Sequence, residues 1–245
     1  QQGMKKAVAG AEREQQAGAS GKWVAHWRMV HIVRPVWEKV GEDNQLGRAF
    51  EPLTHTEQDA QDLVLLEPAP RTVRGARDLL SVALQYGNAF EQGFQAAALK
   101  PADFFDNDDV LYLMEDMATG EIRVSILWEW LHKGAAFTDS DPQTGIQAGD
   151  VLSQQLFERL LDEEYQKLLQ ARNKDVHDNS KTTTLPIVRE IVARYVLAET
   201  KLPWYIDLLN INLDNESLDR AKERVQIYID AFRRDGTRIT ENLDL

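Results

Sequence analysis

The sequence predicts an α/β fold in which helices predominate. Two observations lead to this prediction. Apolar residues recur at helical spacing in several long segments after residue 72, and the few segments that read as strands are short and lie in the first half of the chain. The order of strand and helix gives the chain α/β character up to about residue 40, whereas the part from residue 72 onward is chiefly α-helical.

The first part of the chain predicts one strand, one helix and a long loop. Residues 2–19 are rich in Ala, Gln, Glu and Lys, which indicates either a solvent-exposed helix or a flexible arm. Residues 22–25 read as a short strand. Residues 29–40 carry apolar side chains at helical spacing, although Pro35 would strain the middle of this helix. Prolines and polar residues then predict a loop over 42–70.

The middle of the chain predicts a short strand between helical segments. Residues 72–94 read as one or two helices, and residues 109–114 read as a strand. The clearest helix follows, because Ile122, Ile126 and Trp130 repeat every four residues. A His-Lys-Gly sequence directly after it is a good helix end, since cations interact favourably with the dipole and glycine adopts the left-handed cap.

The remainder of the chain predicts three further helices. A polar loop over 135–149 precedes a long amphipathic helix over 150–172. Pro186 suits the first turn of the next helix. Asp214 or Asn215 can cap the last helix, because both side chains accept hydrogen bonds from backbone N–H groups.

The bulk composition limits the class of protein. The chain has 245 residues, of which 43% are hydrophobic, and this is enough for one large or two small domains with a sizeable core. Its net charge of −12 argues against a nucleic-acid binder and against an anionic membrane surface, since both partners select a basic face. A local cationic pocket for an anion such as a CoA thioester stays open.

The chain has no cysteine, so disulfides, thiolate nucleophiles and cysteine-based zinc sites are excluded. Neither an apolar run of membrane-spanning length nor the apolar core of a signal peptide occurs. These features predict a cytoplasmic protein. Because the sequence starts without an initiator methionine, we expect a processed product or a piece of a longer protein.

A pair of carboxylates, Glu115 and Asp116, stands where the predicted strand ends and the following helix begins. Rigid elements on both sides can hold such a side chain toward a cleft, as a catalytic group requires. The same place suits a helix N-cap, in which Asp accepts a hydrogen bond from the first turn. On the residues alone the cap is the more common use of Asp here, and catalysis is the alternative.

Other polar clusters are interpreted as surface features. The five histidines show no metal-ligand spacing, and an acidic turn lacks the glycine and glutamate pattern of a calcium loop. A basic stripe on the helix after residue 70 is typical of a solvated face. We therefore expect no metal site in this chain. The acidic turn contains Asp103, Asp106, Asp108 and Asp109, and the basic stripe contains Arg71, Arg74 and Arg77.

Two motifs resemble the C-terminal part of malate synthase. Residues 114–119 read Met-Glu-Asp-x-Ala-Thr, and residues 21–26 read Gly-Lys-Trp-Val-Ala-His. The resemblance extends beyond the motifs, since a strand precedes the first one and an Ile-rich helix follows it. It implies that Asp116 is the general base, that Trp23 lines the glyoxylate pocket, and that Met114 packs beside the acetyl group.

The resemblance implies an enzyme that condenses acetyl-CoA with glyoxylate and hydrolyses the thioester to malate and CoA. It implies the last part of a TIM (β/α)8 barrel and a connecting loop in residues 1–70, and a C-terminal helical capping domain that carries the base in residues 71–245. The Mg²⁺ ligands and the glyoxylate arginine would lie on an upstream barrel, which the chain would need as its partner. The family usually has proline where this chain has Trp27. The resemblance does not cover the helices after residue 172, which are available for contacts between the subunits of a homo-oligomer.

Two other functions stay open. The chain is alternatively a non-catalytic helical module of this origin that acts in assembly or regulation, for which its acidic surface and long helices are suited. It is also compatible with a related acyl-CoA lyase or condensing enzyme that acts on a different aldehyde acid. The sequence upstream of Gln1 would separate the enzyme from the module, since only the enzyme needs a barrel with metal ligands.

Overall fold

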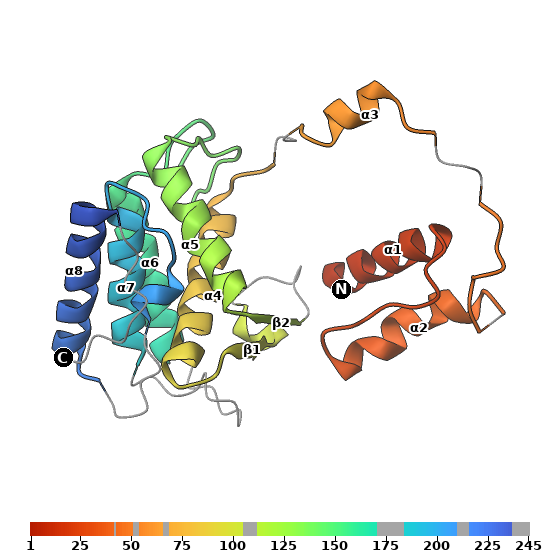
Figure 1. Ribbon diagram of the computed structural model, residues 1–245, viewed down its shortest axis with the longest axis horizontal. Coiled ribbons are helices and arrows are strands. Elements are labelled where there is room, and N and C mark those ends of the chain that lie inside the picture. The colour runs from red at the N-terminus through yellow and green to blue at the C-terminus, as the bar shows by residue number, and fades with distance from the viewer. Residues whose placement is uncertain are drawn as a thin grey trace. The chain divides into compact units, whose positions relative to one another are not determined.

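A computed structural model of the chain is shown in Figure 1. It describes residues 1–41, 43–50, 54–65, 69–104, 112–170, 184–209 and 216–236, except the side chains of Ala102, Met114, Glu115 and Asp235. The chain divides into two compact units. The N-terminal unit comprises Gln1–Ala69 and Ala98–Met114, and the helical unit comprises Pro70–Ala97 and Glu115–Leu245.

The regular structure of the N-terminal unit is mainly helical. Its helices are α1 (Gln2–Gln16), the 3-10 helix η1 (Trp27–Met29), α2 (Val30–Glu38), α3 (Glu57–Asp62) and the 3-10 helix η2 (Pro101–Asp103). α1 packs on α2, and the side chains buried between them are Ala11, Val33 and Val36. This apolar core is small, because most of the α1 sequence is polar or alanine.

Side-chain donors close the C-terminal end of α1. Gln45 Nε2 donates to the carbonyl oxygens of Gln15 at 2.9 Å and Ala19 at 2.6 Å. Trp37 Nε1 also donates to the Ala19 carbonyl, at 2.8 Å. Since a helix end leaves its last carbonyls without intrahelical donors, these bonds satisfy the end of α1 and hold α2 and the loop at Gln45 against it.

The predictions for this unit are partly confirmed. The N-terminal segment is a helix rather than an arm, and α2 forms with Pro35 inside it. The strand expected over 22–25 is wrong, because these residues adopt no regular structure. A strand needs a second strand as the partner for its backbone hydrogen bonds. The described part of the first 69 residues contains no strand that could pair with residues 22–25. The expected loop over 42–70 contains α3, which a capping box between Thr56 and Asp59 begins.

Two short strands, β1 (Ala96–Leu99) and β2 (Leu113–Asp116), pair in a two-stranded sheet. β1 was not predicted, because its Ala-Ala-Ala-Leu sequence lacks the alternation of polar and apolar residues that marks a half-buried strand. The strand predicted over 109–114 overlaps β2 only at its end, and residues 105–111 lie outside the described part. β2 instead continues to Asp116.

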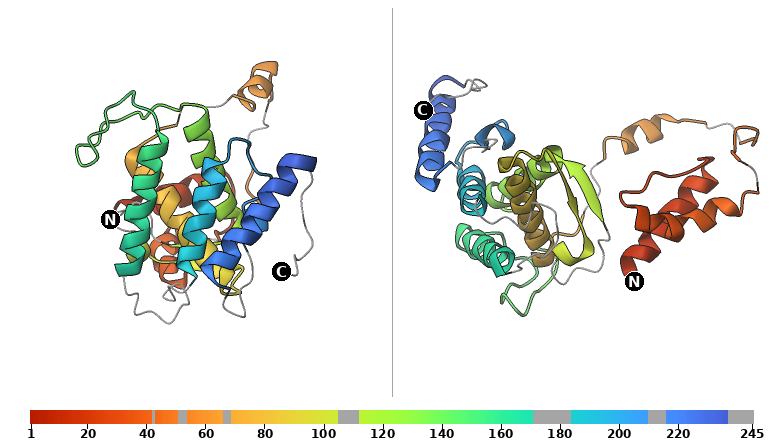
Figure 2. Two further views of the ribbon diagram at one scale, coloured as in Figure 1. Left: turned by 90° about the vertical axis from the view of Figure 1, so that its left-hand side faces the viewer. Right: turned by 90° about the horizontal axis from the view of Figure 1, so that it is seen from below.

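The helical unit is a bundle built around α4, as the two views of Figure 2 show. Its helices are α4 (Val73–Glu91), α5 (Met117–His132), α6 (Gln154–Gln170), α7 (Leu185–Leu197), the 3-10 helix η4 (Ile206–Leu208) and α8 (Leu218–Asp235). α4 packs on α5, α6 and α7, and α8 covers α7. Every residue from 79 to 89 is consequently buried. The prediction of a mostly helical chain is confirmed. None of the described helices is long and apolar enough to cross a membrane.

The details of two predicted helices need correction. α5 ends as predicted, with Gly134 at φ +62° just beyond it. Its predicted apolar stripe is not its buried face, since Ile122 is 57% exposed while Val124 and Leu127 are buried. The cap of α8 is Ser217, whose Oγ accepts the Arg220 N–H at 3.3 Å. The expected caps at residues 214 and 215 lie outside the described part.

A glycine allows the closest packing in the bundle. A Cβ on Gly87 of α4 would lie 2.5 Å from Tyr205 Oη and 2.6 Å from Val188 Cγ1. Both distances are shorter than non-bonded contacts allow, and the Tyr205 side chain is fully buried, so it has no room to withdraw. Gly87 therefore sets the distance of α4 from α7 and from the segment before η4.

The substitution Gly87→Ala is expected to lower the free energy of unfolding of the helical unit by roughly 1–3 kcal/mol, because the added methyl overpacks a rigid contact. Gly120→Ala is the matched control. A Cβ there meets only the flexible end of the Met117 side chain and the Tyr86 Cβ at 3.6 Å, and alanine improves helix propensity by about 1 kcal/mol. Urea unfolding followed by circular dichroism measures both. Equal stability of the two variants would contradict this account of Gly87.

Candidate functional site

Asp116 is the last residue of β2 and the N-cap of α5. Its Oδ1 accepts a hydrogen bond from the Ala118 backbone N–H at 2.9 Å, and its side chain is exposed. The N-cap expected as one alternative is therefore present. Within the described part of the chain, Oδ2 of Asp116 accepts no hydrogen bond. The carboxylate is therefore held at one of its two oxygens, at the junction of β2 and α5.

The first turns of α5 are seated on α4. Met117, Thr119 and Gly120 are buried, whereas Asp116 and Ala118 point outward. Gly120 faces Tyr86 of α4, where a Cβ would lie at an ordinary contact distance of 3.6 Å from the Tyr86 Cβ. The backbone that carries Asp116 is thus fixed from below by packing as well as by the cap.

Glu121 ties α5 to two other segments of the bundle. Its Oε2 accepts the backbone N–H of Tyr205 at 2.6 Å and that of Ile206 at 3.4 Å, which caps the start of η4. Its Oε1 accepts the Tyr195 hydroxyl of α7 at 3.2 Å. Burial raises the pKa of the Glu121 carboxyl, and these hydrogen bonds offset only part of that effect.

Tyr195 extends the same polar cluster. Its hydroxyl lies 3.2 Å from the Leu202 carbonyl oxygen and 3.2 Å from Ser125 Oγ of α5. Its ring meets that of Tyr205 edge to face, with centroids 5.9 Å apart. Burial also raises the pKa of Tyr195, so the hydroxyl stays a neutral donor at physiological pH. α5, α7 and the segment before η4 therefore meet at one hydrogen-bonded cluster, although the buried Tyr205 hydroxyl has no hydrogen-bond partner in the described part of the chain.

The other predicted site residues, Trp23 and Met114, belong to the N-terminal unit. The indole of Trp23 is 71% exposed. Trp27, which stands at the family's proline, is 72% exposed, and the Arg28 guanidinium lies 5.3 Å from its ring centroid. Met114 is in β2, and its side chain lies outside the described part. Trp23 and Asp116 belong to different units.

The described residues do not by themselves provide a metal site. In the described part of the chain, no three His, Asp or Glu side chains gather as metal ligands do. Magnesium prefers six oxygen ligands, among them one or two carboxylates, water and substrate oxygens. The candidate carboxylate is that of Asp116, and one of its oxygens already accepts a backbone N–H. No step of the chemistry is therefore derived through a metal on these residues.

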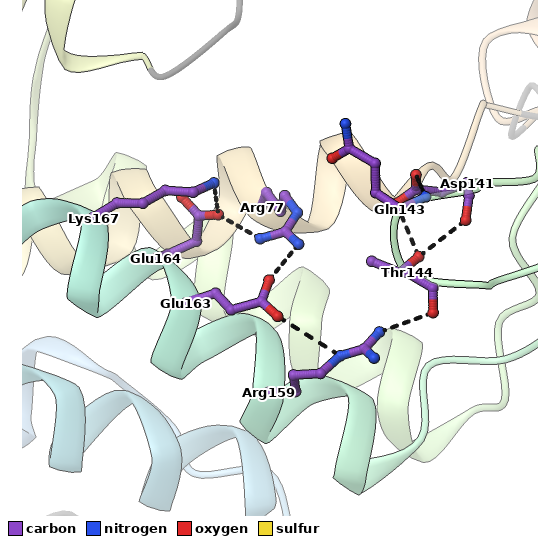
Figure 3. Close-up of polar contacts among 8 residues, drawn as sticks. All are labelled: Arg77, Asp141, Gln143, Thr144, Arg159, Glu163, Glu164 and Lys167. Atoms are coloured by element: carbon purple, nitrogen blue, oxygen red, sulfur yellow. Dashed lines mark hydrogen bonds and ion pairs between the residues drawn. The ribbon is translucent and has the colours of Figure 1, made fainter.

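The basic stripe predicted as a solvated face is largely engaged within the bundle. Figure 3 shows Arg77 of α4 between two carboxylates of α6. Its Nη1 donates to Glu164 Oε1 at 2.8 Å, its Nη2 pairs with Glu163, and Lys167 reaches Glu164 at 2.7 Å. Burial would lower the pKa of Arg77, but its hydrogen bonds to Glu163 and Glu164 outweigh burial and raise it. The surface interpretation is therefore wrong for Arg77.

The same network reaches the loop that precedes α6. Arg159 lies 3.9 Å from Glu163 and donates to the Thr144 carbonyl oxygen at 3.2 Å. Thr144 in turn donates to Asp141 Oδ2 at 2.9 Å, as Figure 3 shows. Arg71, the first member of the predicted stripe, donates to the Ala136 carbonyl at 2.7 Å. These contacts brace α4 and α6 and have no part in the geometry around Asp116.

The comparison with known proteins identifies the family of the chain. The family model described as "Malate synthase, C-terminal" matches residues 71–200, which include Asp116 and the whole of α4 to α7. The chain belongs to the malate synthase family. The resemblance inferred from the two motifs is thus confirmed.

Three curated relatives illustrate the match to the malate synthase family. Malate synthase of Myxococcus xanthus (strain DK1622) is 30% identical over 154 residues, covering 62% of this chain and 26% of that protein. Glyoxysomal malate synthase of Zea mays is 34% identical over 128 residues, covering 51% and 20%. The "Bifunctional glyoxylate cycle protein" of Caenorhabditis elegans is 33% identical over 129 residues, covering 52% and 12%. The chain matches about a quarter or less of these relatives' length.

Sequence reasoning missed Glu121. A glutamate in the second turn of an amphipathic helix reads as a surface residue. The groups that donate hydrogen bonds to Glu121, on Tyr195 and Tyr205, come 74 and 84 residues later in the chain. The sequence signal for Glu121 was weak, since it consists only of a carboxylate separated by one glycine from the motif Met-Glu-Asp-x-Ala-Thr.

The cap at Asp116 gives a first prediction for the site. Asp116→Ala is expected to lower the free energy of unfolding by about 1 kcal/mol, because the Ala118 N–H loses its acceptor. Asp116→Asn keeps a side-chain oxygen for that N–H and should stay within a few tenths of a kcal/mol of wild type. Thermal unfolding of the two variants measures the difference. An alanine variant as stable as the asparagine variant would show that the cap contributes nothing.

The raised pKa of Glu121 gives a pH-dependent prediction. Because its pKa in the folded chain lies above the ordinary 4.5, its contribution to stability is full below about pH 4.5 and is lost as the pH rises through the raised value. Glu121→Gln is neutral at every pH. The stability of this variant relative to wild type should therefore increase from about pH 4 to about pH 8. Urea titrations at several pH values measure this difference, and a constant difference would contradict the raised pKa.

Proposed function

We propose that the chain is the C-terminal portion of a malate synthase, which condenses acetyl-CoA with glyoxylate and releases malate and CoA. Asp116 is the general base. The observation that carries this proposal is the carboxylate at the junction of β2 and α5, held at Oδ1 by Ala118 and exposed at its other oxygen, inside the segment that the family model matches. Residues 71–245 form the C-terminal helical domain, and residues 1–70 form the end of the barrel and the connecting loop.

The geometry of Asp116 suits proton abstraction from a weak carbon acid. Oδ2 takes a proton from the acetyl methyl group, and the C–H electron pair becomes the enolate of the thioester. The enolate carbon attacks the aldehyde carbon of glyoxylate and forms the new C–C bond, while the aldehyde oxygen gains a proton. Water then cleaves the thioester and releases the CoA thiol. The cap at Oδ1 keeps the carboxylate oriented through these steps, which limits the entropy lost on reaching the reactive geometry.

The remaining groups of the site would come from two places. Trp23 lines the glyoxylate pocket and Met114 packs beside the acetyl group. A bound Mg²⁺ polarises an aldehyde and holds developing negative charge, and its ligands belong to the upstream barrel rather than to the described residues. That barrel is the chain's partner, and a homo-oligomer would add contacts between copies. The location is proposed to be cytoplasmic, although relatives named glyoxysomal occur among the matches.

Asp116→Asn in the complete polypeptide tests the assignment of the base. Turnover of acetyl-CoA with glyoxylate, measured as thiol release, is expected to fall by a factor of roughly 10² or more, since the amide cannot accept the proton. Because asparagine keeps the cap, folding should be unchanged, so the loss would reflect chemistry. Glu129→Gln is the matched control, as Glu129 is an α5 carboxylate that pairs with Lys201 at 3.3 Å.

Near-normal turnover of the Asp116→Asn variant would refute Asp116 as the base. Absence of thiol release by the complete wild-type polypeptide would refute the enzyme altogether and leave the non-catalytic helical module as the better account. Thiol release that requires an aldehyde acid other than glyoxylate would point to a related condensing enzyme.

A further inference from the structure

One half-buried carboxylate joins three segments of the bundle, in the same helix as the candidate base. Glu121 follows Asp116 by five residues in the same helix, which is a rise of about 7.5 Å along the helix axis. Its two oxygens accept hydrogen bonds from Tyr205, Ile206 and Tyr195. We propose that Glu121 is a positioning residue that fixes the first turns of α5, and with them the backbone of Asp116, against α7 and η4. The inference rests on the proposed role of Asp116.

The first step of the argument concerns direction. Five residues correspond to about 140° around a helix, so Glu121 leaves α5 on a different side from Asp116. Gly120 meets Tyr86 of α4, while Glu121 meets Tyr195 of α7 and the backbone at Tyr205. The start of α5 is thus held from two sides by two kinds of contact. The packing contact resists approach toward α4, and the hydrogen bonds resist rotation of the helix about its own axis.

The second step concerns what Glu121 supplies. The backbone N–H groups of Tyr205 and Ile206 stand at the start of η4 and need an acceptor, because a helix start leaves its first donors unpaired. The Tyr195 hydroxyl also reaches the Leu202 carbonyl and Ser125 Oγ. A neutral side chain can meet these needs, since a glutamine oxygen accepts the two N–H groups while its amide donates to the hydroxyls of Tyr195 and Ser125. Glu121 acts here as an acceptor of defined length and not through its charge.

A competing explanation is that Glu121 stabilises only the turn at Tyr205 and has no effect on Asp116. The two explanations differ at one atom pair. If Glu121 holds the start of α5, its loss loosens the bond from the Ala118 N–H to Asp116 Oδ1. If it holds only η4, the Ala118 amide is unaffected while the Tyr205 amide loses its acceptor. The exchange of these two amide protons with solvent separates the explanations.

The experiment is residue-resolved amide hydrogen exchange, by NMR, on the 245-residue chain and its variants. Glu121→Ala is expected to speed exchange at Tyr205 and at Ala118 by roughly tenfold each, as the loss of a hydrogen bond of ordinary strength does. The Leu127 amide, in the middle of α5, should keep its wild-type rate. Glu121→Gln should restore both rates to within about twofold of wild type. Glu129→Ala, on the same helix, is the control and should leave both amides unchanged.

Faster exchange at Tyr205 with an unchanged rate at Ala118 would overturn the inference, as would a glutamine variant no better than alanine. If Glu121→Ala unfolds the helical unit, Glu121→Asp takes its place. It keeps the carboxylate but retracts it by one methylene, and the same two amides decide. These results do not depend on turnover. If Asp116→Asn does not reduce activity, the proposed function is refuted but the exchange result for Glu121 is unaffected. If the exchange result contradicts the role of Glu121, the proposed function is likewise unaffected.

Discussion

The burial of α4 on nearly every side is the constraint on which the rest of the helical unit depends. A helix whose residues from 79 to 89 are all buried must satisfy its polar groups internally and accept neighbours at fixed distances. Gly87 sets one of these distances, and Arg77 supplies the polar partner toward α6. α5 then lies on α4 in an orientation that brings the end of β2 to the surface, with Asp116 exposed at the joint. The position of the candidate base thus follows from the packing of α5 on α4.

A single carboxylate at this joint has two separable uses. As an N-cap, Asp116 needs only one oxygen, so capping does not compete with a catalytic role at the other oxygen. The two readings of the sequence are thus compatible in the structure, although they are alternatives on the residues alone. The catalytic use is the one proposed for this member of the malate synthase family, and the cap explains why the side chain is held in place.

The sequence predicted correctly those features that depend on residues close together in the chain. The end of α5 at Gly134 and the formation of α2 with Pro35 inside it follow from residues a few positions apart. The strand expected over 22–25 failed because strand formation depends on a partner, which no local pattern reports. α3 could have been found from the Thr-x-x-Asp capping box that begins it.

The candidate site was only partly predictable for the same reason. Asp116 was identified because its motif is contiguous and carries a family resemblance. The role of Glu121 depends on Tyr195 and Tyr205, which the fold brings to it from distant parts of the chain. The stripe of Ile122, Ile126 and Trp130 has the correct period for a helix, yet the period does not say which of two apolar faces is buried.

The network around Arg77 combines two different responses to ionic strength. Glu164 is 2% exposed, so its pairing with Arg77 is sheltered from dissolved ions. Glu163 and Arg159 are 42% and 46% exposed, and their 3.9 Å contact is one that counter-ions screen. Added salt should therefore weaken this contact within α6, while the pairing of Glu164 with Arg77 of α4 is much less affected. Arg159, which donates to the Thr144 carbonyl oxygen, thus loses the support of Glu163 in concentrated salt, whereas the sheltered pair between α4 and α6 changes little.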